Sequence, residues 1–163
     1  MKRLPIALLA LAALANPAAA QQKPDLKIDI DVVLKGAKIV LNLDHLAYAG
    51  KDPFGLVYAR IMQERFTADS TDWQVIAIFH GAAGYWALSD QAYNRVRRTI
   101  TGNPHAKQIA SLQSGGIRFE ICGLTARDNK WVNADFLPGI AVNSGANFRI
   151  VQLVQDGFIQ IHP

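Results

Sequence analysis

The chain has 163 residues, half of them hydrophobic, with 17 Lys and Arg against 13 Asp and Glu and a formal net charge of +4. This length suits one domain with a hydrophobic core rather than two. The local basic excess at Arg95, Arg97 and Arg98 is typical of a solvated helix face, whereas a nucleic-acid surface needs a longer basic stripe with interleaved aromatic residues. We therefore expect no nucleic-acid partner.

The N-terminus has the pattern of a secretory signal peptide. Lys2 and Arg3 precede an apolar run over residues 4–15 that is too short to span a bilayer, and Ala18 to Ala20 provide small residues for cleavage. We expect cleavage after Ala20, which leaves 143 residues and lowers the formal net charge from +4 to +2. The protein is therefore expected to be periplasmic or secreted, with no membrane association after cleavage.

Residues 21–37 are predicted to form an extended N-terminal segment ahead of a single α/β domain over residues 38–163. In LKIDIDVVL, Leu26 to Leu34, apolar and charged residues alternate, which is typical of an extended segment with one charged face. Such a segment could lie on a sheet edge or on the body of the domain.

Short apolar runs alternate with helical patterns along the rest of the chain. Strands are predicted over 38–44, 73–81, 117–122, 139–142 and 158–161. Helices are predicted over 51–66, 84–100, 101–116 and 144–157. Asp52, Ser89 and Ser144 are the expected N-caps, and Ile150, Val151 and Val154 are expected to face inward. This alternation implies a parallel sheet covered by helices on both faces.

The ends of the predicted strands carry most of the polar and reactive residues. In an open parallel sheet, ligands bind outside the carboxyl ends of the strands. The groups brought to that edge are Asn42, Asp44, His45, His80, Gly81, Cys122, Gly123, Asn143 and Ser144. Neither a GxxxxGK[ST] nor a GxGxxG sequence occurs, so no cofactor is expected.

Cys122 is the single cysteine, so it cannot form an internal disulfide. It is either buried and inert, paired with another chain, or free and reactive. A position between a strand and the first turn of a helix favours the thiolate. Gly123 leaves backbone space for a substrate, and Arg127 could add positive potential. Because free cysteines are also among the most buried residues, the readings stay open.

His80 is the second candidate catalytic residue. It could act as a base or hydrogen-bond partner for the Cys122 thiol if their strands are neighbours, or it could cap the loop that follows it. Gly81 flanks a candidate helix N-terminus that could bind an anion. Asp44 could bind a ligand or simply end the first strand.

Ser144 is expected to cap its helix rather than act as a nucleophile, because no GxSxG sequence surrounds it. No metal site is expected, since no pair of His, Cys or carboxylate residues has convincing metal-ligand spacing. His105 and His162 are expected to be surface residues.

From about Lys38 to Pro163 the chain resembles the DsrE/DsrF-like proteins, including a branch with signal peptides. The resemblance is carried by the strand that ends in His80 and Gly81, by GIRFEICGLTAR, and by LPGIAVNSGANFRIVQLVQDGFIQIHP. It implies a three-layer α/β/α fold with a five-stranded parallel sheet, assembled as a homo-oligomer, a trimer or hexamer. In the sulfur-relay members, a cysteine at this strand end carries sulfur as a persulfide, and Cys122 occupies the matching place. Some relatives have a C-x-x-C pair, whose second position here is Thr125.

We therefore expect a periplasmic sulfur carrier that uses one thiol. Cys122 would accept the sulfur, and His80, Gly123 and Ser144 would shape its pocket. A sulfur donor or acceptor protein would complete the transfer. The alternative is a non-enzymatic oligomeric domain that binds a small molecule or a protein at the same edge, with Cys122 only packing.

Overall fold

The computed structural model describes residues 26–163, and the predicted signal peptide with its cleavage site lies outside them. The chain divides into two units, Met1–Val32 and Val33–Pro163. In the first, residues 26–32 contain neither helix nor strand. The alternating pattern in this segment therefore does not correspond to a strand, and the first strand begins at Gly36.

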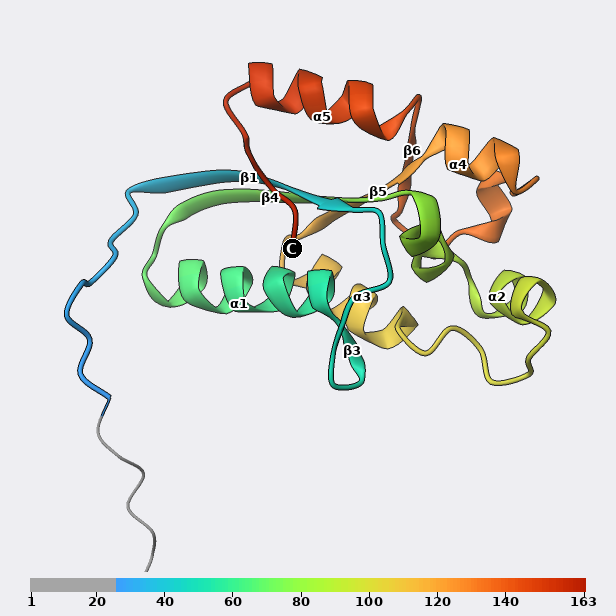
Figure 1. Ribbon diagram of the computed structural model, residues 1–163, viewed down its shortest axis with the longest axis horizontal. Coiled ribbons are helices and arrows are strands. Elements are labelled where there is room, and N and C mark those ends of the chain that lie inside the picture. The colour runs from blue at the N-terminus through green and yellow to red at the C-terminus, as the bar shows by residue number, and fades with distance from the viewer. Residues whose placement is uncertain (1–25) are drawn as a thin grey trace, which may run out of the picture. The chain divides into compact units, whose positions relative to one another are not determined.

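The second unit is built on a five-stranded parallel sheet with the order β6-β5-β4-β1-β7 (Figure 1). Its strands are β1 (Gly36–Leu43), β4 (Asp72–Phe79), β5 (Arg118–Cys122), β6 (Ala141–Asn143) and β7 (Ile159–Ile161). A separate antiparallel pair is formed by the two-residue strands β2 (Tyr48–Ala49) and β3 (Asp52–Pro53). The predicted parallel sheet is confirmed.

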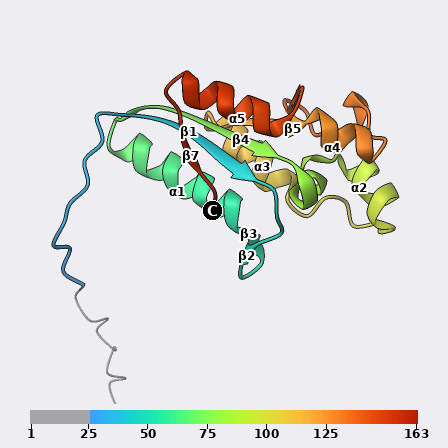
Figure 2. The ribbon, with the colours of Figure 1, turned by 45° about the horizontal axis from the view of Figure 1, so that its top comes forward.

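Helices cover both faces of this sheet. They are α1 (Phe54–Ala68), α2 (Asp90–Arg97), α3 (Ala106–Ser114), α4 (Gly123–Asp128) and α5 (Ala146–Gln155), with 3₁₀ helices at Gly81–Ala87 and Asn133–Asp135. In Figures 1 and 2, α1 and α3 lie on one face and α5 on the other. The three-layer α/β/α fold is confirmed. None of the helices within residues 26–163 is long and apolar enough to cross a membrane.

The two faces of the sheet bury different side chains, because alternate strand residues point to opposite faces. Leu41, Ala77 and Ile121 belong to the larger core, which contains the buried residues of α1 and α3. A smaller cluster under α5 consists of Val40, Ile76, Ile78, Cys122, Ala146, Ile150, Leu153 and Phe158. Cys122 therefore packs beneath α5.

Two predicted helix starts need correction, and one is confirmed. Pro53, not Asp52, occupies the N-cap position of α1, because Asp52 pairs with Ala49 in the β2-β3 pair. The helix predicted over 84–100 is split into a 3₁₀ helix and α2. Ser89 caps α2 as expected, since its hydroxyl oxygen accepts a hydrogen bond from the backbone N–H of Ala92 at 3.3 Å.

The predictions for α5 also change. Gly145 occupies the N-cap position with no side-chain cap, so Ser144 does not cap this helix. Val151 and Val154 are 56% and 46% exposed. Ile150 is buried as expected, and the other residues of the inward face are Ala146 and Leu153.

Candidate functional site

The carboxyl edge of the sheet has two chemically distinct regions. The thiol region consists of Cys122, Gly123, Thr125, Asn143 and Ala146, around the ends of β5 and β6. The histidine region consists of Asp44, His45, His80 and His162, around the ends of β1, β4 and β7. The strand order places β4 between the strands that end in Cys122 and Asp44.

Cys122 is 5% exposed, and its sulfur accepts hydrogen bonds from its surroundings. The backbone N–H of Ala146, at the start of α5, lies 3.2 Å from Sγ. Burial acts to raise the pKa of the Cys122 thiol, but hydrogen bonds from the backbone of Thr125, Ala146 and Leu124 and from the Thr125 side chain outweigh it. The pKa is therefore lowered, and the thiolate is favoured.

Thr125 connects the thiol to the end of β4. Its hydroxyl oxygen accepts a hydrogen bond from the backbone N–H of Gly81 at 3.1 Å, while its side chain also bonds Cys122. Because the Thr125 hydroxyl oxygen is the acceptor in its bond with Gly81, its single proton remains available for donation to the Cys122 sulfur. The residue at the second position of the C-x-x-C pattern thus supplies a hydrogen-bond donor to the thiolate.

A buried ion pair fixes α5 above the thiol region. Glu120, on β5, is 8% exposed. Arg149 of α5 donates to both Glu120 oxygens at 2.9–3.1 Å, and Asn143 Nδ2 donates to Oε2 at 3.0 Å. The Asn143 Oδ1 accepts from the Gly145 backbone N–H at 3.1 Å. Together these bonds hold the start of α5 against the ends of β5 and β6.

A hollow of about 540 Å³ opens at Gly123, the residue after Cys122, and Cys122 itself does not line it. Its lining includes Gly123, Arg127, Asn143 and Ser144, with Trp131 among its aromatic residues. A Cβ on Gly123 would lie 2.5 Å from the Asn143 carbonyl oxygen, so only glycine allows this close approach of backbone. The structure thus brings Gly123 and Ser144 to one hollow, but neither Cys122 nor His80 lines it.

In the histidine region, one carboxylate oxygen joins two histidines. Asp44 Oδ1 lies 2.6 Å from His45 Nδ1 and 2.8 Å from His162 Nε2. Partial burial acts to raise the pKa of the Asp44 carboxyl, but hydrogen bonds from His162 and His45 and the positive charges of His162 and His80 lower it to about 2. His162 reaches Asp44 because β7 runs parallel to β1, with Ile161 opposite Leu41.

His80 is connected to β1 rather than to the thiol. Its Nε2 lies 2.6 Å from Asn42 Oδ1. Burial lowers the pKa of His80, opposed by the charge of Asp44 and assisted by that of His162. Among residues 26–163, the hydrogen-bond partners of the Cys122 sulfur come from α4 and from Ala146, and His80 is not one of them.

The first backbone N–H groups of the loop after β4 donate hydrogen bonds to residues outside the loop. The N–H of Gly81 donates to Thr125, and the N–H groups of Ala82 and Ala83 donate to the Asp44 carbonyl at 2.9 and 3.4 Å. Gly81 has φ +51°, and a Cβ there would lie 2.8 Å from the same Asp44 oxygen. Gly81 therefore serves close packing against Asp44, and these three amides are already hydrogen-bonded rather than directed at an anion.

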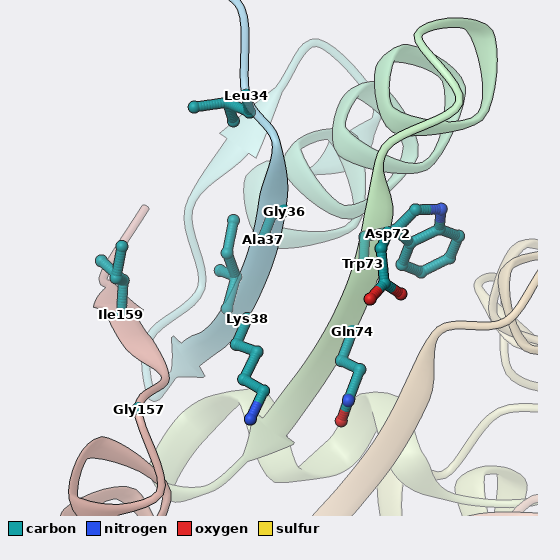
Figure 3. A pocket seen from close by; sticks show the side chains of 10 residues that line it. Leu34, Gly36, Ala37, Lys38, Asp72, Trp73, Gln74, Gly157 and Ile159 are labelled. Atoms are coloured by element: carbon teal, nitrogen blue, oxygen red, sulfur yellow. The ribbon is translucent and has the colours of Figure 1, made fainter.

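Two further features lie away from both regions. His105 is buried, not on the surface as expected: it is 8% exposed, its ring packs at 5.8 Å from that of Trp86, and burial lowers its pKa. A hollow of about 390 Å³ lies at the amino ends of β1 and β4, where Lys38, Asp72 and Gln74 are its polar side chains (Figure 3). It has no thiol or imidazole, and ligands of open parallel sheets bind at the opposite edge.

Comparison with known proteins supports the fold alone. No family model matches the chain, and a search of curated proteins found no match. Among solved structures, a protein of unknown function from Methanobacterium thermoautotrophicum, MTH1491, is similar with a TM-score of 0.58 and 20% sequence identity. The similarity covers 78% of this chain and 99% of that one. This α/β arrangement therefore also occurs in a chain of distant sequence.

Proposed function

We propose that this protein is a sulfur carrier of the periplasm or extracellular space, similar to DsrE-like relay proteins, in which Cys122 carries sulfur as a persulfide. The observation that supports this most is the set of N–H and O–H donors around Sγ. The backbone nitrogen of Ala146 lies 3.2 Å from the sulfur, and Thr125 and Leu124 supply the remaining hydrogen bonds. Such donors stabilise a sulfur anion and serve a thiolate better than a neutral packing residue.

The proposed transfer is a thiol–persulfide exchange with no net oxidation. The Cys122 thiolate attacks the outer sulfur of a donor persulfide, a new S–S bond forms at Cys122, and the donor leaves as a thiolate. In the second step an acceptor thiolate attacks the outer sulfur on Cys122, which leaves as the thiolate. Because Thr125 replaces a second cysteine, the acceptor must come from another molecule.

The hollow at Gly123 would let these partners approach the chain next to Cys122. Arg127 and Ser144 line it, so a persulfide anion approaching from this side would meet a positive charge and a hydroxyl group. Cys122 itself is 5% exposed. Attack on a donor persulfide therefore requires a small opening between α4 and α5, or a partner whose docking opens this region.

Mass spectrometry after incubation with a low-molecular-weight persulfide tests this function. We expect the intact protein to gain the mass of one sulfur atom, and a small thiol acceptor to remove it. Cys122→Ser is the matched control, because it replaces the thiol with a hydroxyl of similar size that cannot form a persulfide. An unmodified wild-type protein, or the same adduct on Cys122→Ser, would contradict the proposal.

A second candidate is a non-enzymatic homo-oligomeric domain, favoured by an exposed apolar surface beside the thiol region. Phe148 is 74% exposed, and Val151, Leu124 and Val142 are 40–56% exposed. A second copy of this chain is the proposed occupant, in line with the trimers and hexamers that the resemblance implies. This function predicts a thiol that an alkylating reagent modifies only after unfolding, together with a molar mass above that of one chain in light scattering. Rapid alkylation of the native protein would favour the sulfur carrier.

A further inference from the structure

We propose that Asp44, His45 and His162 form a binding site for one divalent transition-metal ion. The sequence shows no metal-ligand spacing, since His162 lies 118 residues from Asp44. The fold nevertheless brings a carboxylate oxygen and two imidazole nitrogens within 4.8 Å of one another. This site lies in the histidine region and shares no residue with the thiol region, to which the sulfur-carrier function is assigned.

The three side chains already converge on a common point. Asp44 Oδ1 is the hydrogen-bond partner of both His45 Nδ1 and His162 Nε2, at 2.6 and 2.8 Å. The two rings lie 5.1 Å apart, edge to face. Ligand atoms around a tetrahedral ion with bonds of about 2.0–2.1 Å stand roughly 3.3 Å apart. A metal ion could therefore replace the shared protons if each of the two Asp44–histidine distances opened by less than about 1 Å, and the two ring nitrogens already lie within 4.8 Å of each other.

The backbone that supports these ligands is well held. Asp44 presents its carbonyl to the N–H groups of the loop after β4, including Ala82 at 2.9 Å. His162 directly follows β7, whose register with β1 is set by three pairs from Ile39–Ile159 to Leu41–Ile161. Asp44 and His162 are thus positioned by hydrogen bonds made before any metal binds, which lowers the cost of assembling the site.

The position in the sheet is also one where parallel α/β proteins bind ligands. β1, β4, β5 and β6 are added in one direction, and β7 is added on the other side of β1. The strand order therefore reverses between β1 and β7, and ligands bind outside the carboxyl ends at such a reversal. Asp44 and His45 follow β1, and His162 follows β7.

The ligand set identifies the class of ion. Two imidazoles and one carboxylate suit Zn²⁺, Cu²⁺, Ni²⁺ or Fe²⁺, whereas Mg²⁺ and Ca²⁺ prefer sites made of oxygen ligands. Three protein ligands leave at least one coordination position for water or a small ligand. The Asp44, His45 and His162 side chains are 35%, 50% and 47% exposed, so that position is open to solvent.

Zinc binding to the full chain, purified without a histidine tag, tests the site. We expect one Zn²⁺ per chain in competition with a chromophoric chelator, with no displacement by Mg²⁺ at the same concentration. Asp44→Asn, His45→Gln and His162→Gln should each weaken binding at least about 10-fold, because each removes a direct ligand. Asp72→Asn is the matched control, since this exposed aspartate lies at the amino end of β4, and it should leave the affinity unchanged.

A measurement on the wild-type protein covers the case in which a variant fails to fold. On addition of Zn²⁺, the ring ¹⁵N resonances of His45 and His162 should shift, and those of the buried His105 should not. The site is overturned if binding is not saturable at one equivalent, if the three variants bind like Asp72→Asn, or if the two rings do not respond. In that event the cluster only holds β7 to β1, and the proposed role of Cys122 is unaffected.

Discussion

The two regions at the carboxyl edge of the sheet are built by different means. In the thiol region, Cys122 is 5% exposed, and most of the hydrogen bonds to its sulfur come from backbone N–H groups. In the histidine region, the Asp44 side chain is 35% exposed and is bonded by two other side chains. One region has a protected atom in a fixed environment, and the other has accessible groups that can exchange partners.

The two regions show that the ionisation of a group and its access to solvent are controlled separately. The donors around Cys122 belong to the starts of α4 and α5, so they form whenever the fold forms, and they favour the thiolate without making it accessible. Asp44 is held ionised by histidines that solvent also reaches. The thiol region therefore suits a sulfur anion that must be protected from water and oxidants, whereas the histidine region suits a group that binds directly from solution.

The largest expected effect concerns the ion pair that supports only the thiol region. Glu120→Ala removes the acceptor of Arg149 and Asn143 and leaves a largely buried guanidinium without its carboxylate. We expect the free energy of unfolding to fall by about 3 kcal/mol, as measured by urea denaturation, because removing one partner of a buried pair is strongly destabilising. Zinc binding in the remaining folded protein should not change.

Glu64→Ala is the matched control for Glu120→Ala. Glu64 pairs with Arg60 one helical turn away, but their side chains are 61% and 48% exposed. Exposed pairs of this kind contribute about 0.5 kcal/mol or less. Similar losses of stability in the two variants would mean that α5 is not held by the Glu120 pair.

The second effect tests how tightly the backbone is packed at the thiol. In Gly123→Ala the new Cβ would lie 2.5 Å from the Asn143 carbonyl oxygen, a backbone atom whose residue pairs with Cys122 between β5 and β6. We expect a loss of about 2 kcal/mol in urea denaturation, because the backbone must shift to relieve the overlap. Gly36→Ala, whose Cβ would lie 3.4 Å from the Asp72 oxygen, should change stability by less than about 0.5 kcal/mol. Equal losses of stability in Gly123→Ala and Gly36→Ala would show that the backbone at Gly123 accommodates a Cβ as easily as the start of β1 does.

Much of the fold and part of the candidate site could be predicted from the sequence. The apolar runs that became β1, β4 and β5 are local signals, and topology alone then sends Asp44, His80 and Cys122 to one edge. What stayed hidden depends on which side-chain partners the strands bring together. One alternative had His80 contacting Cys122 if their strands are neighbours; β4 and β5 are neighbours, but the His80 side chain bonds Asn42 on β1, the other strand beside β4.

The histidines illustrate the same limit. His162 looks like an isolated surface residue until β7 is placed beside β1, after which it lies 2.8 Å from Asp44. His105 looks exposed because it follows Asn103 and Pro104 in a polar stretch, but it is packed against Trp86. Glu120 likewise has no local signal for its partner Arg149, which follows 29 residues later on a different element. Pairings between distant elements decide these three outcomes.

The smallest expected effect on stability concerns Thr125 and isolates the control of ionisation. Thr125→Val keeps the shape of the side chain and removes the hydroxyl proton donated to Cys122, while the Gly81 N–H that loses its acceptor is exposed. The cost in stability should stay below about 1 kcal/mol. The pKa of the Cys122 thiol should rise, because one hydrogen bond that stabilises the thiolate is lost.

The ¹³Cβ chemical shift of this single cysteine, followed against pH, measures that change without requiring access to the sulfur. The wild-type thiol should titrate below the ordinary range of a cysteine and the valine variant at higher pH, so that less thiolate is present at neutral pH. Thr125→Ser retains a hydroxyl and should titrate close to the wild type. If the valine variant titrates with the wild type instead, backbone amides alone set the ionisation of Cys122. The ionisation of Cys122 would then depend on no removable side chain, whereas that of Asp44 depends on two histidine side chains.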